Sequence, residues 1–383
     1  MERLASCGYP SYLVGGCVRD LCRAVEPHDY DLTTPASPAE MKRVFDGFRV
    51  IETGIAHGTL TVLSDGDSYE VTTYRVDGDY SDGRHPDGVT FTDSLEEDLR
   101  RRDFTVNAMA YAPAAGLFDP FDGQADLAAR VIRAVGDPEK RFSEDALRIL
   151  RALRFSATLG FTIEKNTAAA LRRLAPTVRR VSPERIREEL FKLLAGGFSR
   201  GVLAAYRDVL FAAVPALASL GDRYPDAAEA AARLSSDPVL SLAALSSPLG
   251  ADATAALLRS LKTDKKSERR AALAVAALAA GLPSTLPEAG LFLVAFGEPT
   301  ARDAIALAAA FGRPTAKTER ALSDFLATGR PTALAELAVR GDDLSAIPAR
   351  ERGEILMRLL NLAAAGEVEN DREALLARAL NNG

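Results

Sequence analysis

The 383-residue chain contains only three cysteines, Cys7, Cys17 and Cys22, which is too few for the disulfide framework of a small secreted domain. No apolar run approaches the roughly 18 residues that a membrane span requires. The first residues also lack the positive charges followed by an apolar segment that mark a secretory signal. We therefore expect reduced thiols, a cytoplasmic location and no association with membranes.

Acidic residues outnumber basic ones in the chain, whose net charge is −6. Residues 130–200 are the exception, because they hold sixteen Lys and Arg against eight Asp and Glu and so carry about +8. The rest of the chain is therefore near −14. This asymmetry favours one segment that faces a polyanion on an otherwise acidic protein. An ordinary solvated helical face is the alternative explanation.

Strand signals are confined to the first third of the chain, which we expect to be an α/β domain. Residues 12–14, 58–63 and 68–74 are rich in apolar and β-branched residues, and Asp65-Gly66 predicts a hairpin turn between the last two. Residues 38–48 predict a short helix. The glycine-rich segment 77–89 predicts a mobile loop, and residues 117–126 predict a connection without regular structure.

Helical periodicity replaces the strand signals from Ser143 onward. The pattern predicts a helix from Ser143 to Leu159, with Ser143 as its N-cap and Asp145 in its first turn. A second helix is predicted from Ser182 to Leu194, with a cap followed by proline at the first helical position. Residues 200–383 are rich in Ala and Leu, are interrupted by prolines and show no clear repeat, which predicts a bundle of short helices.

One stretch near the N-terminus carries most of the candidate chemistry. Gly15 and Gly16 follow a predicted strand, where their backbone N–H groups could approach a phosphate, and Arg19 could add a bidentate contact. Asp29 and Asp31 share one face of the next predicted strand, and two such close carboxylates repel unless a cation lies between them. Mg²⁺ prefers such oxygen ligands together with substrate phosphates. The stretch therefore predicts a nucleotidyl or phosphoryl transferase.

Further candidate residues follow along the chain. Glu70, on a predicted strand, is either a third carboxylate of the site or an exposed strand residue. Arg102, within Arg101-Arg102-Asp103-Phe104, is either a nucleotide contact or part of a solvated turn. On the helix predicted from Ser143, four polar side chains fall on the half opposite the apolar stripe. These four are Asp145, Arg148, Arg151 and Arg154.

Asp145 and Arg148 would be i, i+3 neighbours on that helix. A carboxylate beside a guanidinium offers an acceptor next to a donor, which matches the pairing edges of cytosine and adenine and opposes those of uracil and guanine. This pair could therefore select CTP and ATP without a nucleic-acid template. The alternative is an ordinary ion pair on a helix surface.

Taken in order, these strings resemble the class II tRNA nucleotidyltransferases, the bacterial CCA-adding enzymes and their poly(A) polymerase relatives. The segment from Gly15 to Asp31 resembles the first motif of that family, and the Arg101-Arg102-Asp103-Phe104 string resembles the second. Glu144-Asp145-x-x-Arg148 resembles the nucleotide-selecting motif, and residues 339–356 resemble the family's tail. The resemblance therefore runs the whole length of the chain.

The resemblance implies a head with a mixed five-stranded sheet over residues 1–136, a helical neck over 137–200 and a helical body and tail over 201–383. It implies Mg²⁺ at Asp29 and Asp31, and we expect Glu70 to assist them as a catalytic residue. The implied nucleotide contacts are Gly15, Gly16, Arg19, Arg102, Asp145, Arg148, Arg151 and Arg154. Candidate contacts to the tRNA backbone, or else plain surface charges, are Arg172, Arg173, Arg179 and Arg180.

The implied reaction is the addition of CCA to the 3′ end of tRNA from CTP and ATP, with release of pyrophosphate and without a protein partner. The Asp82-Gly-Arg84-x-Pro86 string resembles the flexible loop of enzymes that add all three nucleotides. A poly(A) polymerase and an enzyme restricted to CC or to A addition stay open as alternatives. A non-catalytic RNA-binding protein is a further alternative, against which the intact Asp29 and Asp31 count.

Overall fold

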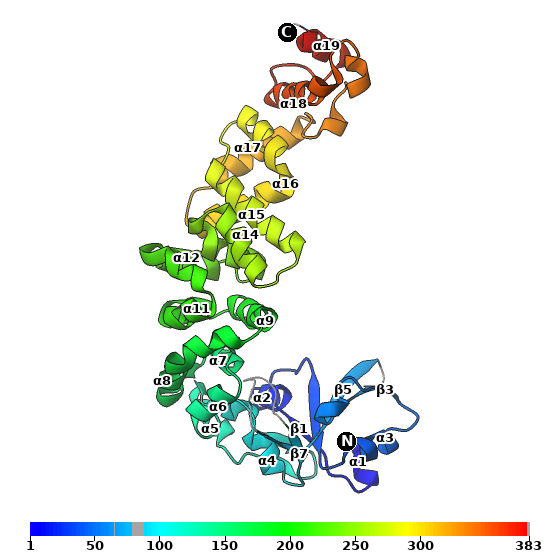
Figure 1. Ribbon diagram of the computed structural model, residues 1–383, viewed down its shortest axis with the longest axis vertical. Coiled ribbons are helices and arrows are strands. Elements are labelled where there is room, and N and C mark those ends of the chain that lie inside the picture. Colours follow the sequence, from blue (N-terminus) through cyan, green and yellow to red (C-terminus); the bar gives the residue numbers. More distant parts are fainter. Residues whose placement is uncertain (65, 79–87, 381–383) are drawn as a thin grey trace. The chain divides into compact units, whose positions relative to one another are not determined.

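The computed structural model describes residues 1–64, 66–78 and 88–380. The described chain divides into two compact units, Met1–Pro215 and Ala216–Gly383. In Figure 1 the labelled strands lie in the blue to cyan part of the chain, and the described part of the second unit is built from helices. The first unit therefore contains the predicted α/β region together with the first predicted helices that follow it.

A seven-stranded mixed sheet forms the centre of the first unit, in the order β3-β4-β5-β2-β1-β8-β9. β2 pairs parallel with β5 and antiparallel with β1, which confirms the expected mixed sheet. The sheet has seven strands where the resemblance implies five, and four of the seven have only three residues. The strands are β1 (Tyr12–Val14), β2 (Tyr30–Thr34), β3 (Arg49–Ile51), β4 (Thr59–Ser64), β5 (Asp67–Thr73), β8 (Ala110–Ala112) and β9 (Gly116–Phe118).

Alternation along β2 and β5 divides the sheet into an apolar and a polar face. Leu32 and Val71 are register partners buried in one core cluster, which also contains Met41 of α3 (Pro38–Val44). Asp31 and Glu70 are the preceding register partners and therefore lie on the opposite face. The period of the strands thus places two candidate carboxylates side by side.

The structure confirms the two predicted strands around Gly66, which pair antiparallel as β4 and β5, whereas Asp65 of the predicted turn lies outside the described residues. The ends of the predicted 77–89 loop pair with each other in β6 (Arg75–Asp77) and β7 (Val89–Phe91). Residues 79–87, which include the Asp82 to Pro86 string, lie outside the described part of the chain.

Two expectations about local structure are wrong. The segment predicted as an irregular connection contains β9 and α5 (Gly123–Ala129). A Cβ on Gly123 would lie 2.4 Å from the carbonyl oxygen of Thr105, so glycine permits close packing here instead of breaking the chain. A short parallel pair of β10 (Val131–Ile132) and β11 (Thr162–Ile163) also follows the region where strand signals were expected to end.

The helix predicted from Ser143 is in fact two helices. α6 (Pro138–Glu144) is capped by Asp137 and ends before Asp145, whose backbone is extended with φ −139°. α7 (Leu147–Leu159) then begins, and the Asp145 carboxylate accepts the backbone N–H of Leu147. A side chain that bonds the backbone in this way competes with helix continuation. The predicted end of the helix at Gly160, in the left-handed conformation, is confirmed.

One of the remaining helices of the first unit begins where the sequence predicted a cap. α9 (Pro183–Leu194) starts after Ser182 with proline at its first turn, as expected. The others are α1 (Glu2–Ser6), α2 (Gly16–Cys22), α4 (Leu95–Arg100), α8 (Lys165–Leu174), α10 (Ser199–Ala205) and α11 (Arg207–Ala213).

The described part of the second unit is helical, and its buried apolar residues include two separate clusters. Phe292 and Phe325 belong to one buried cluster, and Leu359 and Leu375 belong to the other. No described helix is both long and apolar enough to cross a membrane. The main helices are α12 (Tyr224–Ala232), α13 (Pro238–Ser246), α14 (Ala251–Ser260), α15 (Lys265–Ala280), α16 (Leu286–Ala310), α17 (Ala316–Ala327), α18 (Ala349–Ala365) and α19 (Arg372–Leu380).

Candidate active site

One pocket of about 490 Å³ in the first unit gathers the candidate nucleotide-binding residues. Its size falls in the range of small-molecule sites, roughly 300–1,000 Å³. Its walls come from the β1–α2 turn, β2, the segment after α4, α7 and α9. All eight candidates line it: Gly15, Gly16, Arg19, Arg102, Asp145, Arg148, Arg151 and Arg154.

The β1–α2 turn brings backbone and guanidinium groups to the pocket. Gly15 has φ +78°, and a Cβ there would lie 3.0 Å from Nη1 of Arg102, so both conformation and space require glycine. Arg19 donates through Nε and Nη2 to the two carboxylate oxygens of Asp20 at 3.0 and 2.9 Å. Its Nη1 donates to Oδ1 of Asn107 at 2.8 Å. Arg19 is therefore held in one orientation at the pocket wall.

Asp31 lines the pocket, Glu70 is its register partner, and Asp29 directly precedes β2. Burial raises the pKa of Asp31, Arg102 opposes this rise and Asp29 adds to it. Burial also raises the pKa of Glu70, and the charges of Asp31 and Asp29 raise it further. The three predicted carboxylates are therefore close enough to repel one another.

These carboxylates fit a divalent cation by the chemistry of their donors. Hard oxygen ligands that repel each other suit Mg²⁺, which commonly completes its shell with water and substrate phosphate. In the ranges that the structure describes, no group of three or more His, Cys, Asp or Glu is arranged as a ready metal cage. Mg²⁺ sites commonly use only one or two carboxylates together with substrate phosphates.

Asp103 and Asn107 are site residues that the sequence did not reveal. Asp103 accepts Nε of Arg151 at 2.7 Å and Nδ2 of Asn107 at 3.2 Å. Burial opposes ionisation of Asp103, but Arg151 overcomes it and lowers the pKa of Asp103 to about 2. Because Asn107 also accepts Arg19, a continuous chain of bonds fixes Arg19 and Arg151 together. These contacts join segments far apart in the sequence, which spacing alone cannot indicate.

A second acid, Glu189 of α9, lies beside Arg151 and Arg154 of α7. It is only 5% exposed and lies 3.1 Å from Nε of Arg154 and 3.9 Å from Nη1 of Arg151. The guanidinium of Arg154 also stacks 4.1 Å from the ring centroid of Phe155, and those of Arg151 and Arg19 lie 5.4 Å from it. Three cations thus surround one aromatic ring at the pocket wall.

The expectation that Asp145 and Arg148 are neighbours on one helix is wrong, because Asp145 precedes α7 and the two side chains have different partners. Asp145 accepts Nη2 of Arg185 at 2.7 Å and Nη1 at 3.4 Å. Arg148 instead donates to Glu144 at 2.6 Å and to the carbonyl oxygen of Arg101 at 3.0 Å. The i, i+4 spacing of Glu144 and Arg148 could have indicated their pair, whereas no local signal indicates Arg185. Both residues nevertheless line the pocket, each held by a separate partner.

The candidate RNA contacts lie outside this pocket, on α8 and the following 3₁₀ helix (Ala175–Arg180). All four side chains are exposed. Arg172 stacks 4.7 Å from the Tyr206 ring centroid, and Arg173 forms an ion pair with Glu139. Arg179 donates to the carbonyl oxygen of Ala212, and Arg180 makes no ion pair with any residue that the structure describes.

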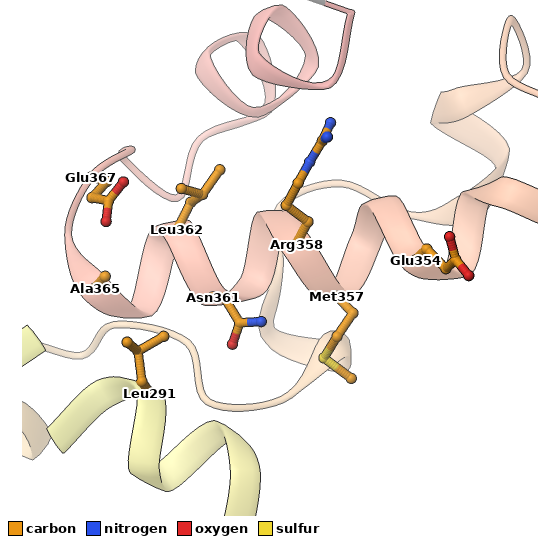
Figure 2. A pocket seen from close by; sticks show the side chains of 8 residues that line it. All are labelled: Leu291, Glu354, Met357, Arg358, Asn361, Leu362, Ala365 and Glu367. Atoms are coloured by element: carbon orange, nitrogen blue, oxygen red, sulfur yellow. The ribbon is translucent and has the colours of Figure 1, made fainter. Parts of the chain in front are cut away.

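Another pocket lies in the second unit, between α16 and α18, and contains none of the candidate residues. Figure 2 shows its lining, in which Leu291 and Met357 expose apolar surface beside the polar Asn361. Leu291 is 41% exposed and Met357 is 44% exposed. The candidate chemistry is therefore concentrated in the first unit.

Comparisons with known proteins find two family matches that lie almost entirely in the first unit. Residues 11–133 match the family described as "Poly A polymerase head domain", and residues 160–220 match "Probable RNA and SrmB- binding site of polymerase A". The CCA-adding enzyme of Lactobacillus delbrueckii subsp. bulgaricus is 38% identical over 383 residues, which cover 98% of this chain and 94% of the relative. That of Leuconostoc citreum is 50% identical over 204 residues, which cover 53% of this chain and 50% of the relative. A crystal structure of the Bacillus stearothermophilus CCA-adding enzyme in complex with CTP is 33% identical, with a TM-score of 0.78 and coverage of 99% of this chain and 95% of that one.

Proposed function

The chain belongs to the CCA-adding enzymes, which are nucleotidyltransferases, and we propose that it adds C, C and A to the 3′ end of tRNA from CTP and ATP. One observation carries the proposal. A single pocket holds the glycine turn, a cluster of arginines, Asp31, and the base-selecting candidates Asp145 and Arg148. Phosphate binding, metal binding and base selection can therefore act on one bound nucleotide.

The proposed reaction forms a bond between the tRNA 3′ oxygen and the α-phosphorus of the nucleotide and breaks the bond from that phosphorus to pyrophosphate. Asp29 and Asp31 would hold Mg²⁺, which when bound lowers the pKa of an attacking hydroxyl and stabilises the charge of the leaving group. Glu70, whose pKa is raised, is suited to receive the hydroxyl proton.

The phosphate groups are proposed to lie against the glycine turn and the arginines. The backbone at Gly16 leaves room for a phosphate oxygen, and Arg19 is fixed beside it. Arg151 and Arg154 add positive charge from α7, and Asp103 and Glu189 hold these two guanidiniums before any ligand arrives. Such preorganised cations stabilise developing charge without having to reorient.

Base selection is proposed to rest on Asp145, which is held by Arg185, and on Arg148, which is held by Glu144. The carboxylate accepts from the amino group of cytosine or adenine, and the guanidinium donates to the adjacent ring nitrogen. Uracil and guanine present the reverse pattern, which would leave a partly buried charge unpaired at a cost of roughly 1–3 kcal/mol per group. The same two side chains therefore accept both correct nucleotides.

The tRNA backbone is proposed to follow the basic stretch, with Arg172, Arg173, Arg179 and Arg180 as contacts. Their exposure leaves their charges accessible to a polyanion. The division into a head over 1–136, a neck over 137–200 and a body and tail over 201–383 stays a prediction.

The test is incubation of tRNA that lacks its terminal CCA with Mg²⁺ and CTP, ATP or both, followed by sequencing of the products. We expect CC with CTP alone and complete CCA with both nucleotides. Extension by repeated A would identify a poly(A) polymerase instead, and products that stop at CC with both nucleotides would identify a restricted enzyme. Binding without any extension would leave only the RNA-binding alternative.

A further inference from the structure

The carboxylate of Asp98 lies near the candidate active site but takes no part in the chemistry proposed above. Asp98 belongs to α4, and it is 0% exposed. A buried charge is costly unless cations and hydrogen bonds satisfy it. The groups around Asp98 therefore indicate what this carboxylate does.

Two neighbouring arginines share Asp98. Arg101 contacts Oδ1 through Nε at 2.9 Å and Nη2 at 2.8 Å, and Nη2 of Arg102 lies 3.8 Å from Oδ2. The hydroxyl of Thr33 lies 3.2 Å from the same Oδ2, and the backbone N–H of Arg75 donates to Oδ1 at 3.4 Å. Asp98 is thus fixed against the strand that carries Asp31, and it attracts one end of Arg102.

The other end of Arg102 faces the candidate metal ligands. A Cβ placed on Gly15 would lie 3.0 Å from Nη1 of Arg102 and 3.8 Å from Oδ2 of Asp31, so both atoms are within 4 Å of one point. The two side chains nevertheless form no ion pair in the part of the chain that the structure describes. Asp103, another acidic neighbour of Arg102, is already engaged by Arg151. Arg102 therefore lies between the Asp98 and Asp31 charges.

We propose that Asp98 is a positioning residue that holds Arg102 away from Asp31, so that Asp31 stays open to a divalent cation and Arg102 stays directed at the nucleotide. The inference rests on the proposed function for the identity of these ligands. If the charge of Asp98 is removed, Asp31 becomes the best remaining partner of Arg102. An ion pair between them would neutralise the carboxylate that the cation requires.

Direct binding measurements test this role with Asp98→Asn, which keeps the shape of the side chain and removes its charge. Mn²⁺ serves as the probe, and electron paramagnetic resonance measures the free ion. We expect the Kd for Mn²⁺ to rise about tenfold, the equivalent of a change of one pKa unit at a carboxylate. Calorimetry with CTP in EDTA should also show weaker binding, because Arg102 is diverted. Unchanged Mn²⁺ binding in a folded Asp98→Asn protein would overturn the proposal.

Glu96→Gln is the matched control. It makes the same chemical change on the same helix, at an exposed carboxylate that pairs with Arg100. We expect its Mn²⁺ binding to equal that of the wild type. A loss as large as that in Asp98→Asn would show a general charge effect and overturn the specific role of Asp98.

A second substitution separates positioning from a merely structural role. Adding Arg102→Met to Asp98→Asn should restore Mn²⁺ affinity, because no guanidinium remains to pair with Asp31. If Asp98→Asn alone does not fold, Arg102→Met is compared with the double variant, and affinities that differ by more than about threefold overturn the proposal. A wild-type protein that binds Mn²⁺ and CTP but does not extend tRNA defeats the proposed function and leaves this comparison intact.

Discussion

The bond between Arg185 and Asp145 provides the sharpest test of base selection. Arg185→Met keeps much of the side-chain length but removes both contacts to the carboxylate, at 2.7 and 3.4 Å. The Asp145 and Arg185 side chains are only 15% and 23% exposed, so water replaces the lost partner poorly. A hydrogen bond to a charged group contributes about 1.5–3 kcal/mol, which corresponds to roughly a 10- to 150-fold loss of kcat/KM.

The assay measures single additions of CTP, ATP and UTP to tRNA substrates that end at the appropriate position. CTP and ATP should lose efficiency to a similar extent, and discrimination against UTP should fall, because the Asp145 acceptor is no longer held in place. Arg185→Lys keeps the charge but not the fork of donors, so its kcat/KM should lie between those of the wild type and Arg185→Met. Arg187→Met, on the same helix but outside the pocket, is the control. Lower activity with unaltered preference among the three nucleotides would refute the reasoning.

Four further expectations concern metal, RNA, the loop and pH. Asp31→Asn should lower turnover at least about 100-fold without lowering the temperature of unfolding, whereas near-normal turnover would remove Asp31 from the mechanism. Affinity for tRNA should fall as salt rises, and replacing Arg179 and Arg180 by Ala should reduce the slope; an unchanged slope would place the RNA elsewhere. Deleting residues 79–88 should preserve C addition and abolish the terminal A, and equal loss of both would indicate general damage. The pKa of Asp103 is lowered to about 2, against about 3.9 in an unfolded chain. The ionised carboxylate therefore stabilises the fold by about 2–3 kcal/mol above pH 4, and this contribution is lost as the pH falls toward 2. The free energy of unfolding of Asp103→Asn, measured in urea, should therefore depend less on acid pH than that of the wild type.

Local patterns were sufficient to predict the parts of the site that depend on neighbouring residues. The apolar run before the two glycines predicted the strand that is β1, and the period of a strand predicted that Asp31 and Leu32 would face opposite sides. The same kind of reasoning failed at Asp145, because helical spacing assumes that the helix continues. The carboxylate bonds the N–H of Leu147 and ends that continuity.

Contacts between distant segments could not be predicted in this way. Asp103 meets Arg151 across 48 positions, and Asp98 meets Thr33 across 65. Each contact joins segments that are far apart in the sequence, and an isolated Asp or Arg carries no signal of it. The fold class therefore followed from periodicity and resemblance, whereas the partner of each charge is set by the three-dimensional fold.

These partners also explain how so many arginines can surround one pocket. Counting charges along residues 130–200 indicates a strongly positive segment, but at the pocket Arg151 is balanced by Asp103, and Arg154 by Glu189. Each acid fixes its guanidinium through an ion pair, and Glu189 does so without lining the pocket itself. A nucleotide then meets cations that are already oriented, and little side-chain entropy is lost on binding. The acids thus lower the net charge of the pocket while making its positive groups more effective.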